Sequence, residues 1–170
     1  MKYLVYAALI VFLVPCQAIL FNHLVVFGVH PDLVLIAVCL IGLQAGELDA
    51  MLVGLALGFT QDVFSGGLHW ENLWLKPLVG LMAGLASRNV INLTPLISLA
   101  LFLALSIFSG SVMYLVKSLQ RPGGDFWAAA EGIILPQACY DAILGVILLI
   151  LLQRWVQSRT RTRLIAASYE

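Results

Sequence analysis

Residues 47–66 read ELDAMLVGLALGFTQDVFSG, and after a short loop residues 71–90 read ENLWLKPLVGLMAGLASRNV. Both stretches carry small or charged residues at every fourth position: Ala50, Gly54, Gly58 and Asp62 in the first, and Lys76, Gly80, Gly84 and Arg88 in the second. A spacing of four places side chains on one face of an α-helix. The two stretches therefore predict two helices, each with a narrow face that another backbone can approach closely.

We expect these helices to form an antiparallel hairpin around Ser65-Gly66-Gly67. The expected register brings four pairs together: Asp62 with Lys76, Gly58 with Gly80, Gly54 with Gly84, and Ala50 with Arg88. At the far end, Glu47 or Asp49 would neutralise Arg88. The alternative is that the stripes face other helices, because small residues at this spacing are common wherever membrane helices pack.

The composition of the whole chain is typical of a membrane protein. Of 170 residues, 62% are hydrophobic and 11% are charged, and the mean hydropathy is +1.01. Soluble domains have roughly 45–50% apolar and about 25% charged residues. The formal net charge is zero, which gives no general attraction to nucleic acid.

The apolar runs predict an all-α bundle of six transmembrane helices, with five as the alternative, since a span needs about 20 mainly apolar residues. The expected spans are Tyr3–Phe27 with a kink at Pro15, Pro31–Gly46, Leu48–Phe64, Glu71–Val90, Pro95–Lys117 and Trp127–Trp155. They make one domain over residues 1–155, followed by a short basic tail over residues 156–170. Lys and Arg gather on the side that holds both termini, which predicts cytoplasmic termini and a tail that contacts lipid headgroups.

Ionisable residues at membrane depth are costly and normally point at a partner. Asp62, Lys76 and Asp141 are therefore expected to be interior anchors, while Asp32 follows Pro31 in the first turn of its helix. The histidines are scattered, and the chain has no phosphate-binding loop and no motif of a hydrolase or metalloprotease. We expect neither an enzyme nor a bound cofactor or metal.

Two segments resemble a known family. Pro31-Asp32-Leu33 opens one span, and Gly54 to Gly66 ends another in Asp-x-x-Ser-Gly, ahead of a helix with Gly80 and Gly84. This pattern is similar to that of the MreD family of bacterial rod shape-determining membrane proteins. The family usually has a glycine four residues after the Ser-Gly, where this chain has Trp70.

The resemblance implies a multi-pass protein of the bacterial inner membrane, with a fold similar to the substrate-binding subunits of energy-coupling-factor transporters. It implies a non-enzymatic scaffold of the cell-elongation complex that binds MreC, beside MreB and the RodA–transpeptidase peptidoglycan synthase. The residues expected to form helix-packing or partner surfaces are Gly54, Gly58, Asp62, Ser65, Gly66, Lys76, Gly80 and Gly84. The expected polar anchors are Pro31, Asp32, Arg88 and Asp141.

Two other classes of function stay open at this point. The first is the substrate-binding subunit of a vitamin transporter, in which Trp70, Asn72 and Trp74 would form part of a pocket. Such subunits often carry Ala-x-x-x-Ala on the first span, whereas here Ala7 and Ala8 are followed four residues later by Val11 and Phe12. The second is a lipid-modifying enzyme that uses Asp62.

Overall fold

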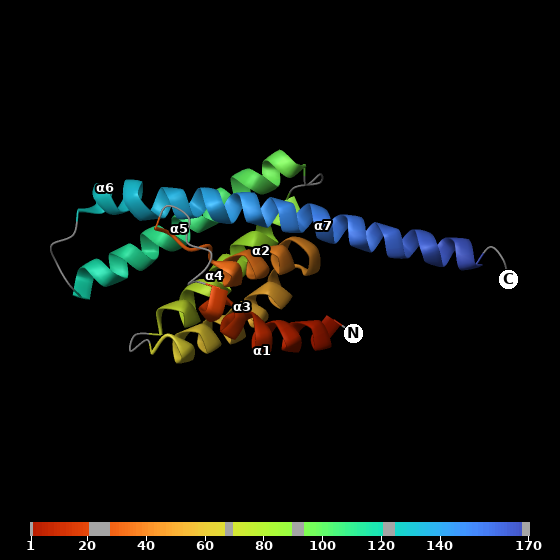
Figure 1. Ribbon diagram of the computed structural model, residues 1–170, viewed down its shortest axis with the longest axis horizontal. Helices are drawn as coiled ribbons and strands as arrows, with labels where there is room; N and C mark the ends of the chain where they lie inside the picture. Colours follow the sequence, from red (N-terminus) through yellow and green to blue (C-terminus); the bar gives the residue numbers. More distant parts are fainter. Residues whose placement is uncertain (1, 21–27, 67–69, 90–93, 121–124, 168–170) are drawn as a thin grey trace.

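The computed structural model describes residues 2–20, 28–66, 70–89, 94–120 and 125–167 (Figure 1). They form helices and no β-strand, which confirms the all-α prediction. The elements are α1 (Lys2–Leu20), α2 (Leu33–Ala45), α3 (Glu47–Phe64), α4 (Glu71–Asn89), α5 (Pro95–Gln120), α6 (Phe126–Ala129), the π-helical turn η1 (Ala130–Ile134) and α7 (Leu135–Ala167). The last three follow one another without a break, so the described chain has six helical rods.

The shortest rod, α2, lies at the centre. Every residue from Val34 to Leu43 is buried, and α2 packs against α1, α3, α4, α5 and α7. A helix that is apolar on all sides is stable only when other helices surround it. Its 13 residues cover about 20 Å at 1.5 Å per residue, against a hydrocarbon core of about 30 Å. The helix begins at Leu33 rather than at Pro31, because Asp32 is its N-cap.

The longest rods, α5 and the one containing α7, lie side by side along one flank of the bundle (Figure 1). Two segments are long and apolar enough to cross a membrane, Pro95–Gln120 and Phe126–Trp155. Phe102 and Leu105 of α5 meet Ala142 and Leu149 of α7 in a core that α2 and α4 share. A second core joins α1, α2 and α3.

The helix ends differ from the predicted spans in a few places. Helix α1 continues through Pro15 to Leu20, and predicted residues 21–27 lie outside the described part, as does Val90. Helix α5 ends at Gln120 instead of Lys117. Helix α7 continues to Ala167, so most of the predicted tail has helical backbone. The start of α1 and the end of α7 point to the same end of the bundle (Figure 1).

The turn between α3 and α4 uses two left-handed residues. The Ser65 N–H donates to the Gln61 carbonyl at 2.9 Å, and Gly66 follows with φ of 62°. Trp70 has φ of 51°, and its ring stacks on Phe59 with a centroid distance of 5.5 Å. A bulky residue in this conformation is strained, whereas glycine is not. The position where the MreD resemblance leads one to expect glycine therefore has the backbone that suits glycine.

We expect Trp70→Gly to be more stable than Trp70→Ala by about 1 kcal/mol, because only glycine removes the left-handed strain. Both variants lose the stacking on Phe59, so their difference reports the backbone alone. Stability can be read in detergent from the labelling rate of Cys39, which is buried, after exposed Cys16 and Cys139 are replaced by serine. Equal labelling of the two variants would show that the strain at Trp70 is negligible.

Candidate functional site

The glycine stripes of α3 and α4 are used inside the bundle. A Cβ atom on Gly58 would lie 2.3 Å from the Asn72 carbonyl oxygen, and one on Gly54 would lie 2.8 Å from that of Lys76. A Cβ on Gly80 would lie 2.6 Å from the Ala50 carbonyl oxygen. The stripes therefore bring the two backbones into contact within the hairpin, as expected, and the buried glycines are not open to a partner helix.

The register of the hairpin differs from the predicted one. Gly58 lies against Asn72 instead of Gly80, and Gly84 lies against Glu47 instead of Gly54. Ala50 correspondingly meets Gly80 and not Arg88. Trp70, the residue before α4, already lies against Phe59, so the C-terminal turn of α3 extends beyond the start of α4. Residues 59–64 therefore lie beside the turn of the hairpin, and Asp62 is not opposite Lys76 as the predicted register required.

Asp62 does not pair with Lys76 as predicted. Its carboxylate accepts from the Leu73 N–H at 2.9 Å, from the Asn72 N–H at 3.3 Å and from Asn72 Nδ2 at 2.8 Å. The first N–H groups of a helix lack partners within the helix and favour a negative charge. The buried Asp62 side chain therefore fixes the start of α4.

Lys76 instead forms an ion pair with Asp32, the N-cap of α2. The Lys76 side chain is 1% exposed, which makes it one of the most completely buried residues described. Asp32 also accepts from the Leu35 N–H at 2.9 Å through its other carboxylate oxygen. This contact joins α4 to the beginning of α2.

Asp141 of α7 joins Asp32, Lys76 and Ser106 in a group of polar residues that we call the polar centre. Its carboxylate accepts from the Asp32 N–H at 2.8 Å and from the Ser106 hydroxyl at 2.7 Å, and the residue is fully buried. Gln17 of α1 accepts from the Val34 N–H at 3.1 Å. Buried polar groups are stable only with such partners. The network ties α1, α2, α4, α5 and α7 together beside buried Pro31, which confirms the interior placement of Asp141.

At the opposite end of the hairpin, Arg88 pairs with Glu47 at 3.4 Å, one of the two predicted partners. The Arg88 side chain is 73% exposed. An exposed pair of this kind contributes little to stability. Arg88 therefore differs in kind from Asp32, although both were predicted to be polar anchors.

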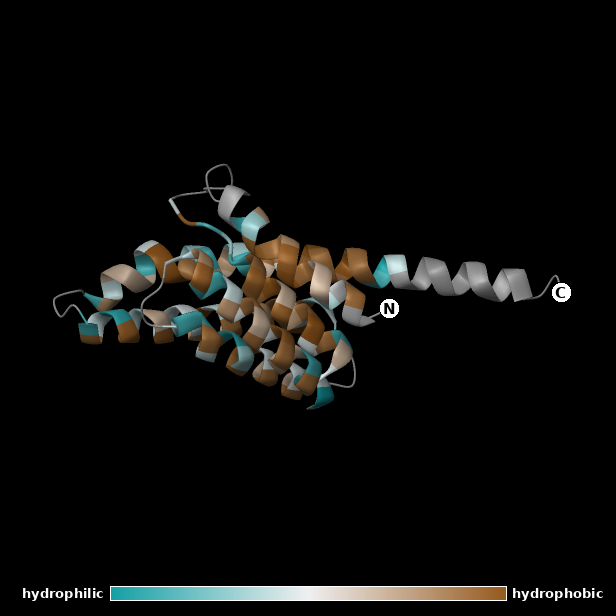
Figure 2. Ribbon diagram, turned by 90° about the horizontal axis from the view of Figure 1, so that it is seen from below, coloured by the Kyte–Doolittle hydropathy of each residue, from teal (hydrophilic) through white to brown (hydrophobic). Residues whose placement is uncertain are grey.

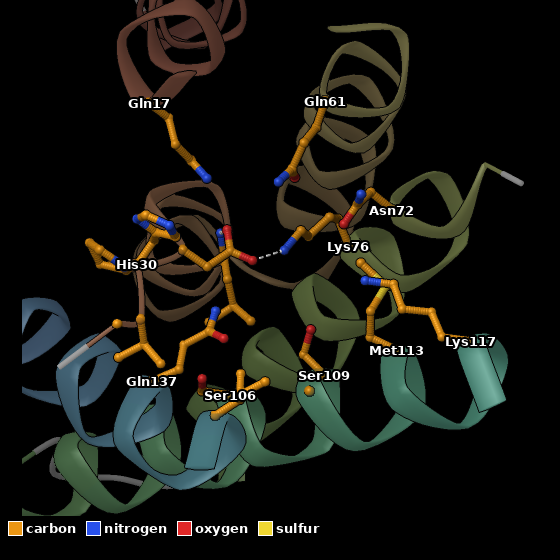
Figure 3. Close-up of a pocket in the computed structure, with 17 residues that line it drawn as sticks. Gln17, His30, Gln61, Asn72, Lys76, Ser106, Ser109, Met113, Lys117 and Gln137 are labelled. Atoms are coloured by element: carbon orange, nitrogen blue, oxygen red, sulfur yellow. Dashed lines mark hydrogen bonds and ion pairs between the residues drawn. The ribbon is translucent and has the colours of Figure 1, made fainter. Parts of the chain in front are cut away.

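A cavity of about 310 Å³ opens beside the polar centre (Figure 3). Polar side chains from five helices and from the segment before α2 line it, and they come from Gln17, His30, Asp32, Gln61, Asn72, Lys76, Ser106, Ser109, Lys117 and Gln137. Apolar lining comes from residues such as Leu35, Met113 and Ile133. Trp74 is 77% exposed, and neither it nor Trp70 lines the cavity.

Several lining residues were not predicted from the sequence. Gln17, Ser106 and Ser109 stand alone in apolar runs, and Gln61 had been part of a helix end only. The only feature of the sequence that marks these residues is a polar side chain within an apolar run. That feature does not show which helices face each other. Gln137 lines the cavity from α7, one helical turn before Asp141.

Among the described residues no three His, Cys, Asp or Glu side chains group as metal ligands. Comparisons of the chain with protein-family models, curated proteins and solved structures gave no match. The resemblance to the MreD family therefore depends on the residues quoted above for it.

Proposed function

We propose that this chain is a non-enzymatic, multi-pass protein of the bacterial inner membrane, a scaffold of the MreD type that binds MreC in the cell-elongation complex. The observation that supports a membrane location is that ionisable side chains are buried inside the bundle while large apolar side chains are exposed on its surface. Lys76 and Asp141 are buried to 1% and 0% exposure, while Leu52 and Trp74 are 62% and 77% exposed. Such an arrangement suits a hydrocarbon solvent, because ionisable groups there turn inward.

The outer face of α3 shows the same inversion. Leu48, Leu52, Leu55, Phe59 and Val63 are exposed on the side away from the glycine stripe. Figure 2 shows apolar residues over the bundle and polar ones mainly near the helix ends. A soluble monomer rarely exposes so continuous an apolar surface, which instead suits lipid or another protein.

The motifs behind the MreD resemblance gain a physical meaning. Pro31-Asp32 forms the start of α2 and the partner of Lys76, and Asp62 to Gly66 caps α4 and turns the chain. Both motifs lie near the polar centre, so both define the same end of the bundle. The positions of the two motifs support a fold of the MreD type, and the partners are part of our proposal. The chain would position MreC, and with it MreB and the RodA–transpeptidase synthase, for lateral wall synthesis.

Because the glycine stripes are buried, a partner helix would contact one of the exposed apolar faces. We expect a photo-crosslinking amino acid at Phe12, Leu52 or Ile147 to give an adduct with MreC from at least one face in native membrane. The same group at Val38, which is 0% exposed, serves as the control. Folded variants without an MreC adduct from any exposed face, in cells that stay rod-shaped when the chain is depleted, would overturn the scaffold proposal.

One observation favours a second candidate, the substrate-binding subunit of an energy-coupling-factor transporter. The polar cavity lies near the helix ends that the predicted orientation places outside. Against it, Val11 and Phe12 are 61% and 71% exposed on α1, where a docking face of small residues would be needed. Co-purification with a coupling subunit instead of MreC would favour the transporter.

A further inference from the structure

The cavity beside Lys76 is more than a packing defect. The voids of apolar helix cores are dry and lined by hydrocarbon, whereas this one has polar side chains from α1, α3, α4, α5 and α7 (Figure 3). Its volume of about 310 Å³ lies within the range of small-molecule pockets. Scaffolding by the outer faces of the bundle makes no use of it.

Two buried acceptors of this cavity have no donor within the described part of the chain. They are Asn72 Oδ1 and Gln61 Oε1, which come from facing helices. Asn72 is 7% exposed, and its own amide nitrogen is fixed on Asp62 at 2.8 Å, so its oxygen is turned away from that carboxylate. A buried acceptor without a donor is costly, and a molecule that donates hydrogen bonds would remove this cost.

The charges on the inner wall of the cavity balance. The ammonium group of Lys76 is paired with the carboxylate of Asp32, and Lys117, the other cation of the lining, is exposed. An anion would have to compete with Asp32 for Lys76, and the same ammonium group disfavours a metal cation at the neighbouring amide oxygens. The ligand that fits this inner wall best is uncharged.

Size and shape narrow the class further. A water molecule occupies about 30 Å³ in the liquid, so the cavity has room for on the order of ten non-hydrogen atoms. The wall combines the amides of Gln61 and Gln137 and the hydroxyl of Ser109 with the apolar side chains of Leu35 and Ile133. Sugar rings and cyclic polyols offer hydroxyl groups at their edges and C–H groups on their faces, which matches such a wall.

We infer that this cavity binds a small neutral molecule rich in hydroxyl groups, of the size of one sugar ring, either free or as the head of a lipid. The hydroxyls donate to Asn72 Oδ1 and Gln61 Oε1, and the amide of Gln137 holds the opposite edge. The inference goes beyond the proposed scaffold function and does not depend on it.

The test uses the full chain in phosphatidylcholine nanodiscs, which contain no sugar. Binding of glucose and myo-inositol is measured by saturation-transfer NMR, beside glucosamine as a cation and gluconate as an anion. We expect saturable millimolar binding of a neutral probe and weaker binding of its charged analogues. Gln61→Met and Gln137→Met should each weaken it at least tenfold, whereas Gln44→Met, the same change at an exposed site away from the cavity, should not.

Cys39 labelling shows that each variant is folded. Octyl glucoside below its micellar concentration separates the two sources: tenfold tighter binding than glucose supports a lipid head, and equal binding supports a free solute. Failure of both neutral probes to bind the folded wild-type chain overturns the inference, as does tighter binding of a charged analogue. Unchanged affinity in both Gln61→Met and Gln137→Met also overturns it. Crosslinking to MreC is a separate readout, so the scaffold proposal can fail or stand independently.

Discussion

Gly58→Ala is expected to destabilise the fold by about 3 kcal/mol, because the added methyl group meets the backbone of α4. The new Cβ would lie 2.3 Å from the Asn72 carbonyl oxygen and 2.8 Å from its carbon. The obstacle is backbone and cannot rotate away, so α3 and α4 must separate. Overpacking of this kind typically costs about 1–3 kcal/mol, and a backbone obstacle belongs at the upper end. The Cys39 labelling rate measures the loss.

The matched control is Gly132→Ala, because nothing lies within 4 Å of a Cβ at that position. Both substitutions add one methyl group to a glycine inside a continuous helical rod, Gly58 in α3 and Gly132 in the π-helical turn η1, so both variants gain from the lower backbone freedom of alanine in the unfolded chain. We expect Gly132→Ala to leave stability unchanged or to raise it by up to about 1 kcal/mol. Similar labelling rates in the two variants would show that Gly58 of α3 is not in close contact with the Asn72 backbone of α4.

The contrast between these glycines shows what the sequence can predict. The spacing of Gly54, Gly58, Gly80 and Gly84 indicated two close-packing helix faces, and the structure has both. Spacing within one helix is a local property, so one sequence suffices to see it. The register between two helices is not local, because it depends on how many residues the connecting segment takes up alongside α3.

The predicted pairing of Asp62 with Lys76 was wrong for a related reason. Asp62 and Lys76 are opposite in sign and near the same loop, which made their pairing attractive. A helix N-terminus also neutralises a carboxylate, and the first turn of α4 is nearer to Asp62. Lys76 then needs an anion from elsewhere, and Asp32 supplies it from a helix that the hairpin argument had not considered. The exposed pair of Arg88 and Glu47 was predicted because Glu47 and Asp49 lie in the first turn of α3, at the end of the hairpin where Arg88 lies in the last turn of α4.

The cavity was beyond prediction from one sequence. Its lining comes from the ends of helices that are far apart along the chain, including Gln17 on α1 and Gln137 on α7. Each of these residues alone reads as a tolerated polar residue in an apolar run. Only the packing around α2, which brings five other helices to one centre, gives them a common role.

The ion pair at that centre gives the second large expected effect. Lys76→Met and Asp32→Asn should each destabilise the fold by about 3–5 kcal/mol, because each leaves one buried charge without its partner. Methionine keeps most of the length of lysine, and asparagine remains a good N-cap for α2, so the charge is the main change.

The double variant, Lys76→Met with Asp32→Asn, distinguishes a charge effect from a packing effect. Removal of both charges leaves neither member of the ion pair as a buried charge without its partner, so we expect the double variant to be more stable than either single variant, and the two losses to be strongly non-additive. The exposed pair is the comparison: Arg88→Gln should cost less than about 1 kcal/mol, and its effect should add to that of Glu47→Gln. Losses that add at Asp32 and Lys76 would mean that water reaches both groups. The polar centre would then be held together by the bonds of Asp141 to the Asp32 N–H and to Ser106, because those do not depend on the Lys76 charge.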